Sequence, residues 1–219
     1  MTPEPDTDQL FAFFERLKTM SSIQRFGTLP MIQSESVAAH SFNVAILSSL
    51  IADYEPELKV DHALLLRKAL FHDFEETILS DIPHPIKHRF QGGKLGKLLK
   101  EIVPALIRDE IFKELPPELR ERCTRAALSA KEGVEGRIVA SADAMDIVMT
   151  SLRELKMGNQ YFQNIFDVGL RLVELHGNFR FTRLFVESSK RYRERGQHAK
   201  GQPTFSDEFV DPEARMMSP

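Results

Sequence analysis

Two histidines and two aspartates stand among apolar residues in segments that otherwise have the pattern of buried helices. The clearest case is His40, which lies between Val37 and Val44 in a series of apolar residues spaced three and four apart. Burying ionised groups costs several kcal/mol or more unless they are paired or bind a metal. Two imidazoles and two carboxylates suit a six-coordinate divalent first-row metal with positions open for water and substrate. The set is His40, His72, Asp73 and Asp143.

Each member alone has a simpler explanation. A single histidine on an apolar helix face is more often hydrogen-bonded in the core than a metal ligand. Asp143 alone could cap a neighbouring helix or pair with an arginine. A closed structural zinc site would more often use cysteines, and Cys123 is the one cysteine of the chain. The prediction of a metal site therefore depends on the four residues together.

The segment ALFHDFEETILSDIPHP, residues 69–85, carries an apolar helix into a group of acids. Neighbouring residues on a helix point about 100° apart, so a metal shared by His72 and Asp73 must lie between their directions, near the helix end. Glu76 lies one turn after His72 on the same face, within reach of a water on that metal. Glu75 points elsewhere, and we expect solvent around it.

Helical periodicity dominates the elements that must position these residues, and no convincing alternation of a strand is visible. Ser36 is a suitable N-cap for the helix that carries His40. We expect a helix over 61–72 with Ala63, Leu66, Leu70 and Asp73 on its buried face. Asp143 is expected on a buried face with Ala140, Ala144 and Ile147. The other expected helices cover residues 8–20, 95–115 with an interruption at Pro104, a stretch opening at Pro116-Pro117, 133–157, and the region to about 195. These patterns predict one all-α domain over residues 8–195 and a polar tail over 196–219.

Composition narrows the classes of function. The chain has 219 residues, and 42% hydrophobic with 28% charged residues is ordinary for a globular domain. A net charge of −3 gives no general attraction to a nucleic-acid polymer or an anionic membrane, although one arginine can still hold a phosphate. A single cysteine permits no intrachain disulfide, and the N-terminus lacks the apolar region of a signal peptide. No apolar run is long enough to span a bilayer, so we expect a cytoplasmic protein.

Three short motifs resemble the H…HD…D pattern of the HD-domain phosphohydrolases. They are VAAHS at 37–41, HD at 72–73 and ADA at 142–144. Three further features resemble the bacterial 5′-deoxynucleotidases of that superfamily more closely. These are Arg25 before the first histidine, Glu76 four residues after the second, and SDIPHP at 80–85. The resemblance covers most of the chain from about residue 11 to 157.

The resemblance implies an all-helical HD fold, often a homodimer, that hydrolyses nucleoside 5′-monophosphates. It implies one divalent metal ion, cobalt or manganese in vitro, with magnesium, iron, nickel or zinc as alternatives. Arg25 would grip the phosphate, and Glu76 would manage the proton of the attacking water next to the ligand Asp73. The residues that it places at the metal are His40, His72, Asp73 and Asp143. Those that it places around the substrate are Arg25, Phe26, Asp81, Ile82, Pro83, His84 and Asp143.

The chain departs from the family pattern at two positions. Phe26 stands where the best-known member has a tryptophan that helps to select deoxyribose, and this chain contains no tryptophan. A smaller ring could relax discrimination against a 2′-hydroxyl group or shift base preference. Ala39 stands where many members have a glutamate before the histidine. The contact that this glutamate makes to a metal ligand is therefore in doubt, whereas the ligands themselves are all present.

Two alternatives stay open from the sequence. The enzyme could act on a deoxynucleoside triphosphate or another nucleotide rather than on a monophosphate. The chain could also be a catalytically silent HD module that binds nucleotide or a partner, although the presence of all four ligands and Glu76 argues against this.

Overall fold

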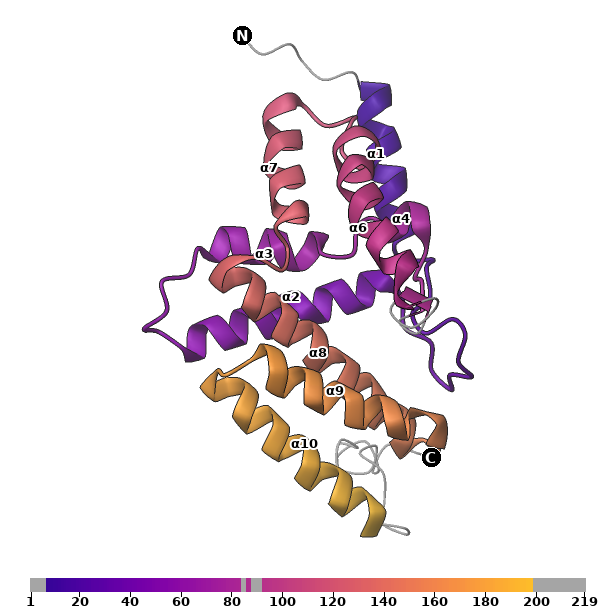
Figure 1. Cartoon of the computed structure of the whole chain (residues 1–219), viewed down its shortest axis with the longest axis vertical. Coiled ribbons are helices and arrows are strands. Elements are labelled where there is room, and N and C mark those ends of the chain that lie inside the picture. The colour runs from indigo at the N-terminus through magenta and orange to yellow at the C-terminus, as the bar shows by residue number, and fades with distance from the viewer. Residues whose placement is uncertain (1–6, 84–85, 88–91, 199–219) are drawn as a thin grey trace, which may run out of the picture.

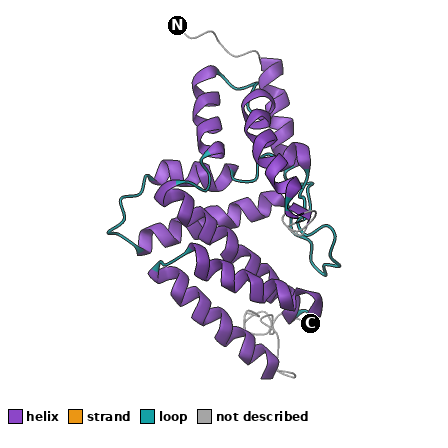
Figure 2. Ribbon diagram, in the orientation of Figure 1, coloured by secondary structure: helices purple, strands orange, loops and turns teal. Residues whose placement is uncertain are grey.

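The computed structural model describes residues 7–83, 86–87 and 92–198. Helices account for its regular structure, and the described residues contain no β-strand (Figure 2). The all-α prediction is confirmed. The last helix continues to His198, beyond the boundary expected near 195, whereas His84 and residues 199–219 of the predicted tail lie outside the described residues. The elements are α1 (Thr7–Thr19), α2 (Val37–Tyr54), α3 (His62–Phe71), α4 (Glu76–Leu79), α6 (Lys94–Leu106), the π-helical η2 (Ile107–Ile111), α7 (Pro117–Leu128), α8 (Gly133–Lys156), the 3-10 turn η3 (Gln160–Phe162), α9 (Gln163–His176) and α10 (Arg180–His198).

Helix α8 is the centre of the arrangement, because α2, α3, α9 and α10 all pack against it. In Figure 1, α2 and α3 cross the middle of the molecule, α8, α9 and α10 lie below them, and α1, α6 and α7 stand above. One hydrophobic cluster joins α2, α3, α8, α9 and α10, and a second joins α1, η2, α7 and the turn after α3. The ends of α2 and α3 that carry the predicted ligands lie where the two clusters approach each other.

Helix α2 forms as its sequence predicts. The Ser36 side chain accepts a hydrogen bond from the backbone N–H of Ala39, which caps the first turn. The apolar positions spaced three and four apart are all buried, and His40 is fully buried among them. The buried face consists of Val37, His40, Val44, Leu47 and Ile51.

Two expectations about the other helices are wrong. In α3 the buried face contains Leu65 and Ala69, whereas Leu66 and Leu70 are partly exposed. The run Leu64-Leu65-Leu66 is apolar at every position, so its periodicity does not specify one face. Pro104 does not interrupt its helix either, because α6 continues through it to Leu106 and η2 follows directly.

An aromatic cluster fixes the turn that follows α3. The Phe74 ring stacks on Phe112 with centroids 5.5 Å apart, and Phe71 packs edge-on against both. These rings flank His72 and Asp73 in the chain, so the aromatic core on one side of the turn directs the two polar side chains to the other side. Phe74 and Phe112 are essentially inaccessible to solvent, which makes this anchor rigid.

Within the described residues, no helix combines the length and the apolar character that crossing a bilayer requires.

Candidate metal centre

The imidazoles of His40 and His72 face each other across 3.1 Å between their Nε2 atoms. The Nδ1 atom of His72 lies 2.8 Å from the carbonyl oxygen of Ala69, which can only accept, so this nitrogen carries the hydrogen. The Nδ1 atom of His40 lies 2.7 Å from a carboxylate oxygen of Asp146 and donates to it. In two neutral rings, both Nε2 lone pairs would then point at one another. The arrangement needs positive charge between the two nitrogens, which a proton on His40 or a divalent metal ion can supply.

Two carboxylates complete the cluster around this pair. The Asp73 Oδ2 atom lies 3.1 Å from Nε2 of His72, and Asp143 Oδ1 lies 3.4 Å from Nε2 of His40. Single ligand atoms of His40, His72 and Asp73 all lie within 4.8 Å of one another. The structure therefore brings together the four residues that the sequence predicted as ligands, from α2, the end of α3 and α8.

The pKa values of the cluster show that its carboxylates favour positive charge at the imidazoles. Burial and the charge of Arg25 oppose protonation of His40, but hydrogen bonds to the surrounding carboxylates outweigh both and raise its pKa to about 10. Burial also disfavours ionised Asp73 and Asp143. The interactions of Asp73 with the imidazoles, and of Asp143 with a lysine, nevertheless hold the pKa of both carboxyls well below the usual range.

Asp146 is the most deeply buried acid of the site, and the sequence analysis did not identify it. Its Oδ2 atom accepts from His40 and from Arg25, and its Oδ1 atom accepts from Asn43 at 2.9 Å. Asp143, one turn earlier on α8, is about one quarter exposed. The spacing of three residues between the two aspartates could have predicted the role of Asp146, because residues three apart lie next to each other on one helix face. Small residues at Ala142 and Ala144 let α2 approach this face closely.

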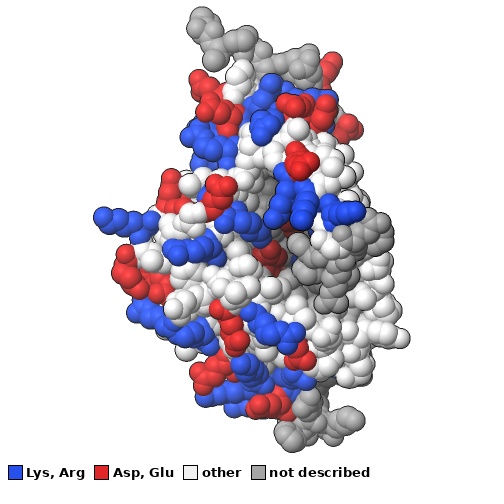
Figure 3. Space-filling view, viewed as in Figure 1, with Lys and Arg blue, Asp and Glu red and all other residues white. Residues whose placement is uncertain are grey.

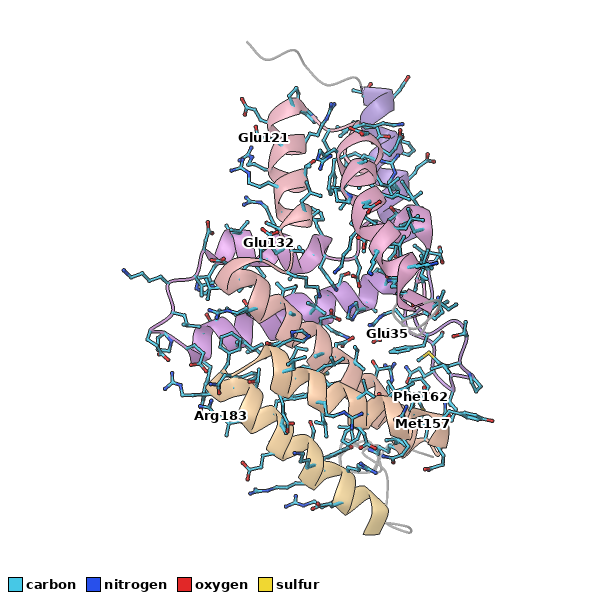
Figure 4. The ribbon with its side chains drawn as sticks, viewed as in Figure 1. Glu35, Glu121, Glu132, Met157, Phe162 and Arg183 are labelled. Atoms are coloured by element: carbon cyan, nitrogen blue, oxygen red, sulfur yellow. The ribbon has the colours of Figure 1, made fainter. Side chains whose placement is uncertain are left out.

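Arg25 lies in the segment between α1 and α2, beside the metal cluster. Its NH1 group is 3.2 Å from Asp146 and 3.4 Å from Glu35, and its side chain is nearly buried. Glu35 is itself held by the Thr150 hydroxyl at 2.9 Å. Glu35, labelled in Figure 4, lies two residues before α2, and Thr150 belongs to the C-terminal half of α8. Arg25 is thus fixed beside the site by two buried carboxylates, of which the sequence predicted neither.

Phe26, the next residue, connects this segment to the predicted substrate loop. Its backbone N–H donates to Asp81 Oδ2 at 2.9 Å, and its φ of 55° is unusual for a residue with a large side chain. Its ring packs edge-on against Phe162, with centroids 5.6 Å apart, and lies 5.0 Å from the Arg25 guanidinium. Ile82 and Pro83 follow Asp81 in the irregular segment after α4 and are partly buried. Of the residues that the sequence placed around the substrate, His84 lies outside the described residues.

A buried glutamate near the C-terminus of α8 holds the segment that contains Arg25 and Phe26. The Glu154 carboxylate is fully buried and accepts from the backbone N–H groups of Ile32 and Gln33, each at 2.9 Å. Asn159 donates to the same carboxylate at 2.6 Å and to the carbonyl of Pro30 at 2.7 Å. Hydrogen bonds to α8 therefore determine the path of this segment.

Acids and bases surround the mouth of the cluster. Burial, together with the charges of Asp73 and Asp81, raises the pKa of Glu76 to about 8, and Lys87 lies 3.8 Å away. Glu75 is partly buried rather than solvated as expected, and burial with the Asp73 charge raises its pKa to about 7. The Lys131 Nζ atom is 2.5 Å from Asp143 Oδ2. Figure 3 shows acidic atoms in a hollow near the middle of the molecule, with lysine and arginine side chains around it.

The chain is similar in sequence to a family of known proteins. Residues 12–188 match the model of a family described as 5′-deoxynucleotidase YfbR-like. A 5′-deoxynucleotidase of Vibrio cholerae is 32% identical over 168 residues, which cover 73% of this chain and 84% of that protein. A second relative, from Vibrio parahaemolyticus, is 30% identical over 156 residues, covering 68% of this chain and 78% of its own length.

Solved structures share the fold. An HD-domain phosphohydrolase from Listeria innocua superposes with a TM-score of 0.68 at 22% identity, covering 94% of this chain and 92% of the other. A cyanophage S-2L HD phosphohydrolase, bound to dA and one catalytic Zn²⁺ ion, gives a TM-score of 0.53 at 18% identity. This match covers 83% of the present chain and 94% of the cyanophage chain.

Proposed function

Because the chain belongs to the YfbR-like 5′-deoxynucleotidase family, we propose that it hydrolyses deoxynucleoside 5′-monophosphates to the nucleoside and inorganic phosphate. Membership of this family makes it a nucleotide phosphohydrolase, and the fold that it shares with a phosphohydrolase holding a catalytic Zn²⁺ ion supports dependence on a metal. The observation that carries the proposal is the pair of facing imidazoles, whose Nε2 atoms are 3.1 Å apart beside Asp73 and Asp143.

The metal would be held by His40, His72, Asp73 and Asp143. A divalent ion bound there would lower the pKa of a coordinated water and offset charge on a phosphoryl oxygen. Nitrogen and carboxylate ligands suit several first-row metals, so the donors do not select one. We propose cobalt and manganese for the first assays, and zinc with them because the cyanophage relative holds Zn²⁺.

Residues of the chain supply the remaining functions. Glu76 is buried at the mouth of the cluster, where a carboxyl with a pKa of about 8 can both take and return a proton near neutral pH. Arg25 would offset charge on the phosphate oxygens, and its attachment to Asp146 and Glu35 keeps it in place before the substrate arrives. Phe26, Asp81, Ile82 and Pro83 would contact the sugar, with Phe26 in the position that bears on deoxyribose selection.

The experiment is an assay of the wild-type protein with dAMP, AMP and dATP in the presence of Mn²⁺, Co²⁺ or Zn²⁺, read by product identity. We expect nucleoside and inorganic phosphate from dAMP. Release of triphosphate from dATP, with no reaction of dAMP, would show that the substrate is a triphosphate. Metal binding without turnover of any nucleotide would identify a silent module. The ratio of dAMP to AMP turnover measures the discrimination that Phe26 allows.

A homodimer and a cytoplasmic location also belong to the proposal. The face of α2 opposite its buried side exposes Phe42, Ile46 and Leu50, one turn apart along the helix, and a second copy of the chain would cover these residues. Light scattering after size-exclusion chromatography tests the dimer, and a monomer at micromolar concentration would contradict it. Cys123 is a free thiol, which suits a reducing compartment.

A further inference from the structure

Lys131 lies in the turn between α7 and α8, at the edge of the metal cluster. Its Nζ atom is 2.5 Å from Asp143 Oδ2, while the other oxygen of that carboxylate is 3.4 Å from Nε2 of His40. The ammonium group therefore binds the outer oxygen of a carboxylate whose inner oxygen faces the imidazole pair. No sequence pattern selects this lysine, because it lies in a turn outside every helical pattern.

The backbone of this turn is held rigidly. A Cβ atom at Gly136 would come within 2.3 Å of the Lys131 carbonyl carbon, so the turn packs directly against the first turn of α8. The buried Lys68 side chain donates to the carbonyl of Glu132 at 2.7 Å. Glu132, labelled in Figure 4, marks the point where the turn enters α8. The Lys131 side chain thus projects from a fixed base toward Asp143.

Arg25 and Lys131 differ in how many carboxylates each one contacts and in how exposed each side chain is. Arg25 contacts two carboxylates through NH1, and its side chain is 11% exposed. Lys131 contacts one carboxylate, and its side chain is 45% exposed. An ammonium group has three N–H donors, and Asp143 uses one of them. Lys131 therefore has donors available to an anion that enters the cluster.

We propose that Lys131 binds a phosphoryl oxygen of the substrate, on the Nε2 side of His40, while Arg25 acts from the Nδ1 side. This inference rests on the proposed function, since it takes the substrate to be a phosphate monoester. In a site that already holds Asp73, Asp143 and Asp146, a dianionic phosphate needs such a cation in addition to the metal. Lys131 is then a substrate-binding residue as well as a partner of Asp143.

The test separates phosphate binding from a purely structural role of Lys131. Inorganic phosphate is titrated into wild-type protein, Lys131→Met, Lys131→Arg and the control Lys190→Met, all at saturating Mn²⁺, by isothermal titration calorimetry. Lys190 pairs with Glu174 on the surface, far from the cluster in sequence. We expect Lys131→Met to weaken phosphate binding roughly tenfold or more, the size of one charge-assisted hydrogen bond. Lys131→Arg should recover most of the affinity, and Lys190→Met should equal the wild type.

Unchanged phosphate affinity of Lys131→Met at saturating metal would overturn the inference, whatever happens to Mn²⁺ affinity, because Lys131 would then only orient Asp143. Lys131→Gln, compared by circular dichroism, replaces the methionine variant if that variant does not fold. Wild-type protein assayed with dAMP in parallel keeps the two proposals distinguishable. Absence of dAMP hydrolysis by the wild type rejects the proposed function, whereas equal phosphate binding by wild type and Lys131→Met rejects only the role of Lys131.

Discussion

The Nδ1 atom of His40 lies 2.7 Å from the Oδ2 atom of Asp146, and neither side chain is accessible to solvent. A carboxylate that accepts from the far nitrogen of a histidine fixes both the tautomer and the orientation of the ring. The same oxygen lies 3.2 Å from Arg25. One buried atom therefore serves the predicted metal ligand and the predicted phosphate-binding residue, which couples the positions of the two.

Asp146→Asn should lower metal affinity by 10- to 100-fold, by analogy with other residues that orient metal-bound histidines. The amide keeps the shape but removes the charge that orients the imidazole and Arg25. Calorimetric titration with Mn²⁺ measures the effect. Asp53→Asn, on the exposed end of the same helix α2 as His40, is the control and should bind Mn²⁺ like the wild type. Equal Mn²⁺ affinity in the wild type and Asp146→Asn would show that Asp146 does not orient His40.

Glu76→Gln should reduce turnover at least about 100-fold, the usual contribution of a positioned proton carrier. The amide cannot carry the proton, but it preserves the volume of this buried side chain. Metal content and phosphate affinity should stay close to those of the wild type, since Glu76 is not among the proposed ligands. Glu57→Gln, at an exposed pair with Arg180, serves as the matched control. Wild-type turnover in Glu76→Gln would remove this residue from the mechanism.

Glu154→Gln should destabilise the protein by about 1–3 kcal/mol, the cost of leaving a buried hydrogen-bonding group unsatisfied. Both carboxylate oxygens accept backbone N–H groups, so a glutamine must turn its own NH₂ group toward one of these donors. Chemical denaturation gives the stability, and hydrogen exchange of residues 25–35 shows whether the segment opens locally. The exposed Glu174→Gln should change neither measurement. If residues 25–35 of Glu154→Gln are protected from hydrogen exchange as in the wild type, Glu154 does not hold this segment in place.

The sequence predicted burial correctly for a polar residue whose helix neighbours three and four positions away are apolar. His40 stood out because its neighbours at three and four residues are apolar on one side of α2, and the structure buries that whole face. In α3 the three consecutive leucines left two faces equally apolar, so the prediction chose the wrong one. A run of consecutive apolar residues therefore does not specify which face of a helix is buried.

The contacts that hold Arg25 and Phe26 could not be predicted from the sequence. They come from side chains distant in the chain. Asp146 pairs with the Arg25 guanidinium, whereas Glu154 and Asp81 accept from backbone N–H groups of the segment. Such bonds leave no periodic pattern, because the donor is a backbone N–H that nearly every residue has. Lys131 was missed because its position depends on how the turn before α8 packs.

Phe26→Trp should place a fluorescent reporter at the substrate site, because the chain has no other tryptophan. The indole would stand beside Arg25 and against Phe162, so nucleotide binding should change its emission. Titration of the metal-loaded variant with dAMP and with AMP would then give both affinities. If the larger ring restores selection of deoxyribose, the ratio of dAMP to AMP turnover should rise above that of the wild type. Emission that does not respond to dAMP at saturating concentration would place Phe26 away from the substrate.

The ion pair of Arg16 with Glu114 should make stability depend on pH in a way that the metal centre does not affect. The guanidinium binds both carboxylate oxygens, at 2.7 and 2.8 Å, and this hydrogen bonding lowers the pKa of Glu114 below its ordinary value of 4.5. A lowered folded-state pKa gives stability that is fully present above pH 4.5 and is lost as the pH falls through the folded value. Glu114→Gln should therefore cost about 1–2 kcal/mol at pH 7 and progressively less below pH 4. Denaturation of both proteins across this range measures the difference, with the exposed Glu121→Gln as a control that should cost under about 0.5 kcal/mol at either pH. A difference between wild type and Glu114→Gln that stays constant from pH 7 to pH 3 would contradict the lowered pKa.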